Sequence, residues 1–150
     1  MYLDLDVSPD GSSLSYWNWE NDDSADGKGS HIHLLDIASG LDQRVTFDPT
    51  ASGETGMRYS PDGTQVVLAS EHGSRAQLMI SPTDRSEPGR LVGPAHSVES
   101  ETTWGFSPDG AKIVLSVGSA APVFIDAATG EVNTAPDSLG IFSGWQRRAP

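Results

Sequence analysis

The tetrapeptide Ser-Pro-Asp-Gly occurs three times in this chain of 150 residues, at residues 8–11, 60–63 and 107–110. The prolines of successive copies are 52 and 47 residues apart. Internal repeats with periods of about 20 to 50 residues are typical of chains built from repeated supersecondary units. The sequence therefore predicts three copies of one structural unit.

Each tetrapeptide predicts a hairpin turn. Pro fixes φ at the first corner, Asp can bind the neighbouring backbone, and Gly adopts the left-handed conformation that closes the turn. Short runs of β-forming residues follow each copy and predict second strands at 14–17, 66–69 and 113–117. We expect third strands at 31–37, 77–80 and 123–126, and weaker fourth strands near 43–47, 89–92 and 132–134.

Alignment of the three copies on their turns indicates a shared core. Two columns of large apolar residues result: Leu14, Val66 and Ile113 in one, and Tyr16, Leu68 and Leu115 in the other. Residues two apart on a strand share a face, so these columns predict core positions. The third strands of the first and third copies also end alike, in Asp followed four residues later by Gly, at Asp36 and Asp126.

Together these residues resemble the WD-repeat-like β-propeller family of the TolB type, whose repeat centres on Ser-Pro-Asp-Gly, an apolar strand and a strand ending in Asp-x-x-x-Gly. The resemblance covers nearly the whole chain. It implies an all-β fold with blades of four antiparallel strands at about 1–50, 51–97 and 98–140, and a C-terminal tail at 141–150. Propellers of this kind are interaction platforms in some proteins and substrate-gating domains beside hydrolases in others, so the fold does not select a function.

The chain is strongly acidic, with 21 Asp and Glu against 9 Lys and Arg and a formal net charge of −12. This charge repels phosphate backbones and anionic lipids, so we expect no nucleic-acid partner. No apolar stretch approaches the ~20 residues that span a bilayer, so we expect a soluble protein without membrane segments. We identify no signal peptide in the chain as given, whereas TolB-type proteins are often exported. The compartment stays open between the cytoplasm and the periplasm or cell exterior.

Three blades pose a problem of closure, because propellers close with about four to eight blades and an open row exposes faces and edges. A homodimer that completes one six-blade ring is the simplest closed solution. Alternatively, the chain is a C-terminal fragment of a longer protein. Its last residues, 141–150, resemble the Trp-Gln-Arg ending of many TolB-type proteins, whereas Met1 enters a strand almost at once.

An acidic insertion in the first copy resembles a calcium loop. Asp22, Ser24 and Asp26 supply oxygen ligands at positions 1, 3 and 5, and Gly27 stands at position 6, where such a loop turns sharply. Position 12 is His33 rather than a bidentate Glu, so the local ligand set is incomplete. The missing ligands favour a solvated acidic loop over a calcium site.

Trp17 and Trp19 are candidate binding residues, because the other copies hold small or polar residues at these positions. Their spacing of two places both indoles on one strand face. They could form an aromatic platform for a sugar, a peptide or a partner's side chain. Packing between blades is the favoured alternative, since large aromatic residues are mostly buried. Trp104 shares a column with Leu5 and Met57, and we expect it in the core.

The sequence contains no Gly-x-Ser-x-Gly nucleophile elbow, no His-Glu-x-x-His zinc motif and no phosphate-binding loop. We therefore expect a non-catalytic module that binds protein or peptide and self-associates in its minimal form. The alternative is the substrate-gating propeller of a larger hydrolase, such as a prolyl-oligopeptidase-like peptidase. No cofactor other than the calcium of the acidic loop is expected.

Overall fold

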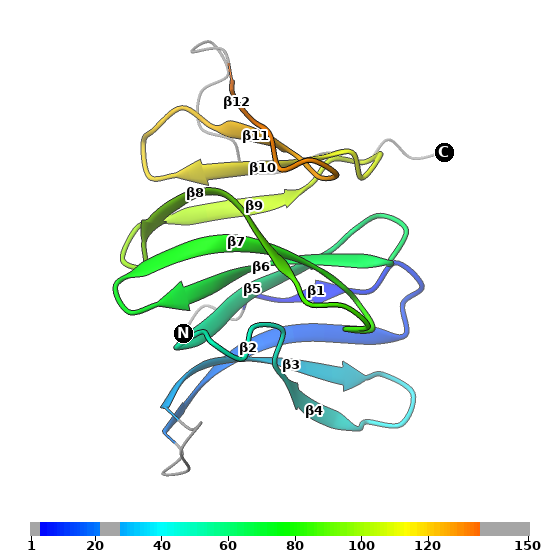
Figure 1. The fold of residues 1–150 in the computed structure, drawn as a ribbon. Coiled ribbons are helices and arrows are strands. Elements are labelled where there is room, and N and C mark those ends of the chain that lie inside the picture. Colours follow the sequence, from blue (N-terminus) through cyan, green and yellow to red (C-terminus); the bar gives the residue numbers. More distant parts are fainter. Residues whose placement is uncertain (1–3, 22–27, 136–150) are drawn as a thin grey trace.

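The computed structural model describes residues 4–21 and 28–135. All regular structure in these residues is β-strand, arranged as three four-stranded antiparallel sheets (Figure 1). Each sheet contains one Ser-Pro-Asp-Gly turn between its first two strands. The predicted all-β fold with four-stranded antiparallel blades is confirmed, and we call the three sheets blades 1, 2 and 3.

In each blade the strands follow one another in sequence order, each paired with the next. Blade 1 consists of β1 (Asp6–Val7), β2 (Ser13–Asn21), β3 (Lys28–Asp36) and β4 (Asp42–Val45). Blade 2 consists of β5 (Gly53–Tyr59), β6 (Gln65–His72), β7 (Arg75–Pro82) and β8 (Arg90–Ser97). Blade 3 consists of β9 (Thr102–Phe106), β10 (Lys112–Val117), β11 (Val123–Asp126) and β12 (Val132–Thr134).

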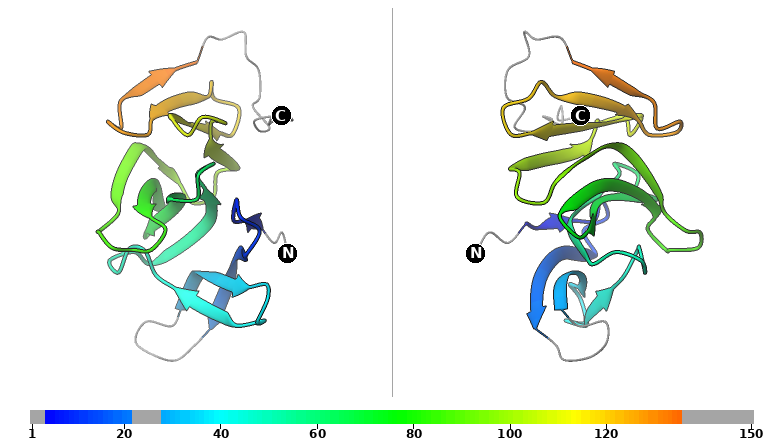
Figure 2. Two further views of the ribbon diagram at one scale, coloured as in Figure 1. Left: turned by 90° about the vertical axis from the view of Figure 1, so that its right-hand side faces the viewer. Right: turned by 60° about the vertical axis from the view of Figure 1, so that its left-hand side comes forward.

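The blades are stacked in sequence order, with blade 2 between the other two (Figures 1 and 2). The first strand of blade 2, β5, contacts the first strands of both neighbours, β1 and β9. The first strands therefore lie along one common edge of the stack, and β4, β8 and β12 lie at the opposite edges of their sheets.

The Ser-Pro-Asp-Gly turns have the conformation that the sequence predicts. In the first turn, the Gly11 N–H donates to the Ser8 carbonyl at 2.8 Å, and Gly11 has a φ of +74°. The Ser8 hydroxyl donates to Asp10 Oδ1 at 2.6 Å, and this bond is the main reason that the pKa of the Asp10 carboxyl is lowered to about 2. The turns at 60–63 and 107–110 repeat these bonds with Asp62 and Asp109.

Two apolar layers hold the blades together, one on each side of blade 2. The central strand β6 alternates between them: Val66 and Leu68 pack toward blade 1, and Val67 and Ala69 pack toward blade 3. These four side chains are at most 2% exposed. Each layer therefore forms from the facing surfaces of two blades.

The predicted burial of the two aligned columns is confirmed in blades 2 and 3 and is wrong in blade 1. Ile113 and Leu115 of blade 3 are at most 1% exposed, as are Val66 and Leu68 of blade 2. Leu14 and Tyr16 of blade 1 are only half-buried. In blades 2 and 3 this face packs on the preceding blade, whereas no described residues cover it in blade 1.

A buried carboxyl, that of Glu54, holds the connection between β4 and β5. Glu54 is 2% exposed, and its Oε1 accepts hydrogen bonds from the backbone N–H groups of Phe47 and Asp48, at 2.8 and 2.6 Å. Burial removes solvent from the charged form and raises the pKa of the carboxyl to about 7, although the two N–H donors act in the opposite direction. The charge of this buried group therefore changes near neutral pH.

We expect the free energy of unfolding to fall as the pH rises from about 5 to about 8. The Glu54 pKa is about 7 in the folded chain against a reference value of 4.5, so in this window the folded state keeps a proton that the unfolded state has lost. At full ionisation the loss amounts to about 3 kcal/mol. Urea unfolding at a series of pH values, followed by tryptophan fluorescence, measures this change in the free energy of unfolding.

Glu54→Gln should flatten this pH dependence, because the side chain no longer titrates. Glu131→Gln is the matched control, since it removes a carboxylate from an exposed turn of blade 3 and should leave the dependence unchanged. A Glu54→Gln variant with the native slope would contradict the assignment.

Candidate functional site

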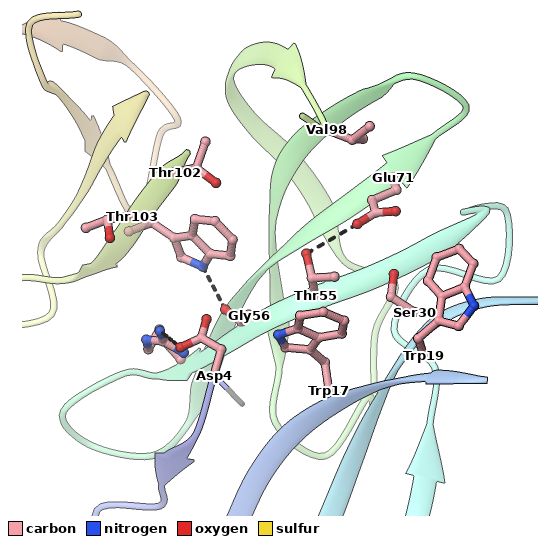
Figure 3. A pocket seen from close by; sticks show the side chains of 12 residues that line it. Asp4, Trp17, Trp19, Ser30, Thr55, Gly56, Glu71, Val98, Thr102 and Thr103 are labelled. Carbon is pink, nitrogen blue, oxygen red and sulfur yellow. Dashed lines mark hydrogen bonds and ion pairs between the residues drawn. The ribbon is translucent and has the colours of Figure 1, made fainter. Parts of the chain in front are cut away.

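A pocket of about 720 Å³ lies beside β2, β5 and β9, toward the strand ends that point away from the Ser-Pro-Asp-Gly turns (Figure 3). All three blades contribute to its walls. Its lining includes the indoles of Trp17, Trp19 and Trp104 and the polar side chains of Asp4, Ser30 and Glu71. The pocket thus combines the surfaces of three indoles with charged and hydroxyl-bearing side chains.

The shape of the pocket depends on a bulge in β5. The pairing of β5 with β6 shifts register between Thr55 and Arg58, and Gly56 inside this interval has a φ of +62°. The Gly56 carbonyl accepts a hydrogen bond from the Trp104 indole N–H at 2.8 Å, and a Cβ on Gly56 would overlap the Trp104 ring. Glycine is therefore required at this position by both its backbone conformation and the close approach of Trp104.

Trp104 differs from its predicted role as a core residue. It is half-buried, and one side of it packs against the apolar layer between blades 2 and 3. It also lines the pocket. The alignment of Trp104 with Met57 correctly predicts that Trp104 contacts an apolar layer. The indole is larger than the methionine side chain, however, and extends beyond this layer.

Trp17 and Trp19 both line the pocket (Figure 3). Trp17 is half-buried and packs against the apolar layer between blades 1 and 2. Trp19 is 59% exposed. The two tryptophans therefore differ. Trp17 packs between the blades and also lines the pocket, whereas most of the Trp19 side chain stays exposed.

Glu71 and Ser30 form a polar part of the site that no motif of the sequence indicates. Thr55 Oγ1 donates to Glu71 Oε1 at 3.4 Å. Ser30 is 2% exposed, and its hydroxyl has no hydrogen-bond partner. A Cβ on Gly53 would lie 2.6 Å from Ser30 Oγ and 2.9 Å from Glu71 Oε2, so both oxygens occupy the space that the missing side chain leaves. The sequence contains one indication of Glu71: when the copies are aligned on their turns, it stands in the same column as Trp19, a candidate binding residue.

Arg58 and Asp4, which both line the pocket, form an ion pair. Arg58 Nη2 contacts Asp4 Oδ1, and Arg58 Nη1 donates to the Met57 carbonyl at 3.0 Å. The charge of Arg58 is thus balanced within the pocket.

The predicted calcium ligands Asp22, Ser24 and Asp26 lie outside the described residues, so the calcium loop stays a prediction. Within residues 4–21 and 28–135, no three His, Asp or Glu side chains come together in a way that could hold a metal ion.

A serine, a histidine and an aspartate meet near the β4–β5 connection. Ser70 Oγ lies 3.1 Å from His72 Nε2, and Asp48 Oδ2 lies 3.3 Å from the same nitrogen. In a catalytic triad the serine and the aspartate bind opposite ring nitrogens, and the serine is accessible. Here Ser70 is fully buried and donates directly to Asp48 at 2.7 Å, so the cluster is a structural network.

In the part of the chain that the structure describes, no helix is long and apolar enough to cross a membrane.

No protein-family model matches the sequence. Among solved structures, the chain is similar to TolB from Acinetobacter baumannii, with a TM-score of 0.67 and 17% identity over 88% of this chain and 31% of that one. It is also similar to the acylaminoacyl peptidase of Pyrococcus horikoshii (TM-score 0.61, 12% identity, 95% of this chain and 27% of that one). A third similar structure comes from a study of two prolyl endopeptidases (TM-score 0.59, 14% identity, 91% of this chain and 22% of that one).

These similarities show a β-propeller fold, and the chain spans less than a third of the length of each of these structures. The described residues therefore have the fold of β-propeller blades.

We expect Gly56→Ala to destabilise the chain by about 3 kcal/mol, because alanine is strained at a φ of +62° and its methyl group would overlap Trp104. Gly105→Ala is the control, since Gly105 has no left-handed φ and an added Cβ meets no atom within 4 Å. Thermal and urea unfolding compare the two variants. Equal stabilities would contradict the role of the bulge.

Proposed function

We propose that the chain is part of a TolB-type propeller and acts as a non-catalytic module that binds a protein or peptide in the pocket beside β2, β5 and β9. The observation that carries this proposal is the convergence of three indoles on one pocket of about 720 Å³. Tryptophan is the residue type most often found at the energetic centre of protein interfaces. An extended peptide of a few residues fits a pocket of this volume and aromatic composition.

A phage-displayed library of random heptapeptides, panned against the purified chain, tests this proposal. Selected peptides are synthesised, and their dissociation constants are measured for the native chain and for Trp19→Ala. We expect Trp19→Ala to weaken binding about thirtyfold, the effect of losing an interface residue worth about 2 kcal/mol. Trp19 is 59% exposed, so its truncation should leave folding intact.

Leu91→Ala is the matched control, because Leu91 is 47% exposed on β8 and does not line the pocket. It should bind the selected peptides as the native chain does. Peptides that bind Trp19→Ala as tightly as the native chain, or no selected peptides at all, would reject the pocket as a peptide site.

We further propose that the outer face of blade 1 packs against another blade, with a homodimer that completes a six-blade ring as the minimal form. Val7 and Ile37 on this face are 49% and 53% exposed. Their counterparts in blade 3, Phe106 and Ala127, are 8% and 7% exposed because they pack against blade 2. The exposed face of blade 1 therefore has the pattern of a surface that packs against a preceding blade.

Light scattering on the purified chain tests this association. We expect a mass of about twice the chain mass of 15.9 kDa. Val7→Asp should return the mass to that of one chain, because it places a charge in the apolar interface. Val132→Asp is the control, since Val132 is 44% exposed on β12, away from this face. A native chain that is monomeric at all concentrations would reject the homodimer.

The alternative function is a substrate-gating propeller of a larger hydrolase. The similarity to the acylaminoacyl peptidase and to the prolyl endopeptidase structure favours it. The full reading frame of the gene distinguishes the two functions, because the hydrolase alternative requires an encoded hydrolase domain and the binding module does not.

A further inference from the structure

We propose that the pocket binds a basic side chain of its peptide ligand, with arginine preferred, between the indoles of β2 and the Glu71 carboxylate. This inference rests on the proposed function and names the chemistry of the group that the pocket recognises. It follows from the charges, the unsatisfied hydroxyl and the aromatic surface of the site.

The first argument is charge. Among the residues that the structure describes, the ionisable side chains lining the pocket are Asp4, Arg58 and Glu71, and the first two pair with each other. The Glu71 carboxylate accepts one hydrogen bond, from Thr55 at 3.4 Å, and no described basic side chain pairs with it. The lining therefore carries one formal negative charge for which a ligand can supply the counter-charge, in a chain whose net charge is −12.

The second argument is the buried hydroxyl of Ser30. Its oxygen is buried and has no hydrogen-bond partner, and buried polar groups are nearly always paired. In Figure 3 the hydroxyl points between Trp17 and Trp19 toward Glu71. Ser30 Oγ and Glu71 Oε2 both lie over Gly53. A ligand group with several N–H donors would satisfy the two oxygens together, which a carboxylate or an apolar side chain could not do.

The third argument is the aromatic surface beside these oxygens. Trp19 is paired in register with Ser30 across β2 and β3, and Trp17 lies two residues away on the same face. The face of an indole attracts a cation more strongly than that of any other side chain. A positive group that reaches Glu71 and Ser30 would therefore also contact the indoles.

Arginine meets these three conditions better than lysine. Its planar guanidinium stacks on an aromatic ring while its forked N–H donors reach two acceptors at once. The ammonium of lysine carries the same charge but does not stack, so it should bind more weakly.

The test uses blocked tripeptides, acetyl-Ala-X-Ala-amide, in which X is arginine, lysine, citrulline or glutamate. Binding to the native chain is followed by NMR through the indole N–H signals of Trp17 and Trp19. We expect the arginine peptide to shift these signals and to bind about tenfold more tightly than the citrulline peptide, which has the same shape without the charge. Lysine should lie between the two, and glutamate should not bind.

The variant Glu71→Gln should abolish the preference for arginine over citrulline. Glu131→Gln makes the same change of net charge at an exposed turn of blade 3 and should keep the preference. Because the tripeptide series is measured on the native chain, the inference is tested even if Glu71→Gln fails to fold.

Equal binding of the arginine and citrulline peptides, no indole shift with arginine, or an arginine preference retained in Glu71→Gln would overturn the inference. A peptide library that returns Trp19-dependent ligands without basic residues would also overturn it and would leave the proposed function intact. If neither the library nor the tripeptides yield Trp19-dependent binding, both proposals fail.

Discussion

The fold depends on one constraint: each blade is a single sheet with two apolar faces, and both faces must be covered by neighbours. β6 shows this requirement most directly, because Val66 and Leu68 pack on blade 1 while Val67 and Ala69 pack on blade 3. A blade is therefore stable as a member of a row, in the way that repeat proteins gain stability from the interfaces between adjacent units. The exposed outer face of blade 1 follows from the same constraint, since its residues are suited to a neighbour that the described residues do not supply.

The pocket is a consequence of how the row is assembled. The first strands of the blades share one edge, and the β5 bulge at Gly56 allows Trp104 of blade 3 to lie against the backbone of blade 2. Blade 1 adds the indoles of β2 to the same space. No single blade contains this site, so its aromatic and polar groups are brought together by packing between blades.

The sequence predicted the repeated elements well because their causes are local. A Ser-Pro-Asp-Gly turn contains its own hydrogen-bond donors, acceptors and left-handed glycine, and alternation along a strand assigns side chains to faces. The placement of Trp17 and Trp19 on one face follows in the same way. The burial of Leu14 and Tyr16 was predicted wrongly, because alternation identifies an apolar face and does not show whether a neighbour covers it.

The sequence by itself determined three blades of four strands, the turn between the first two strands of each blade and the faces on which its apolar residues lie. These features depend on interactions between residues a few positions apart or on the period of a strand. The tertiary structure decided that Trp104 both packs on the core and lines a pocket, and that Glu71 and Ser30 share the space over Gly53. Contacts between separate strands and blades depend on register, on the β5 bulge and on the packing of adjacent sheets. The residue pattern within a single repeat does not predict these features.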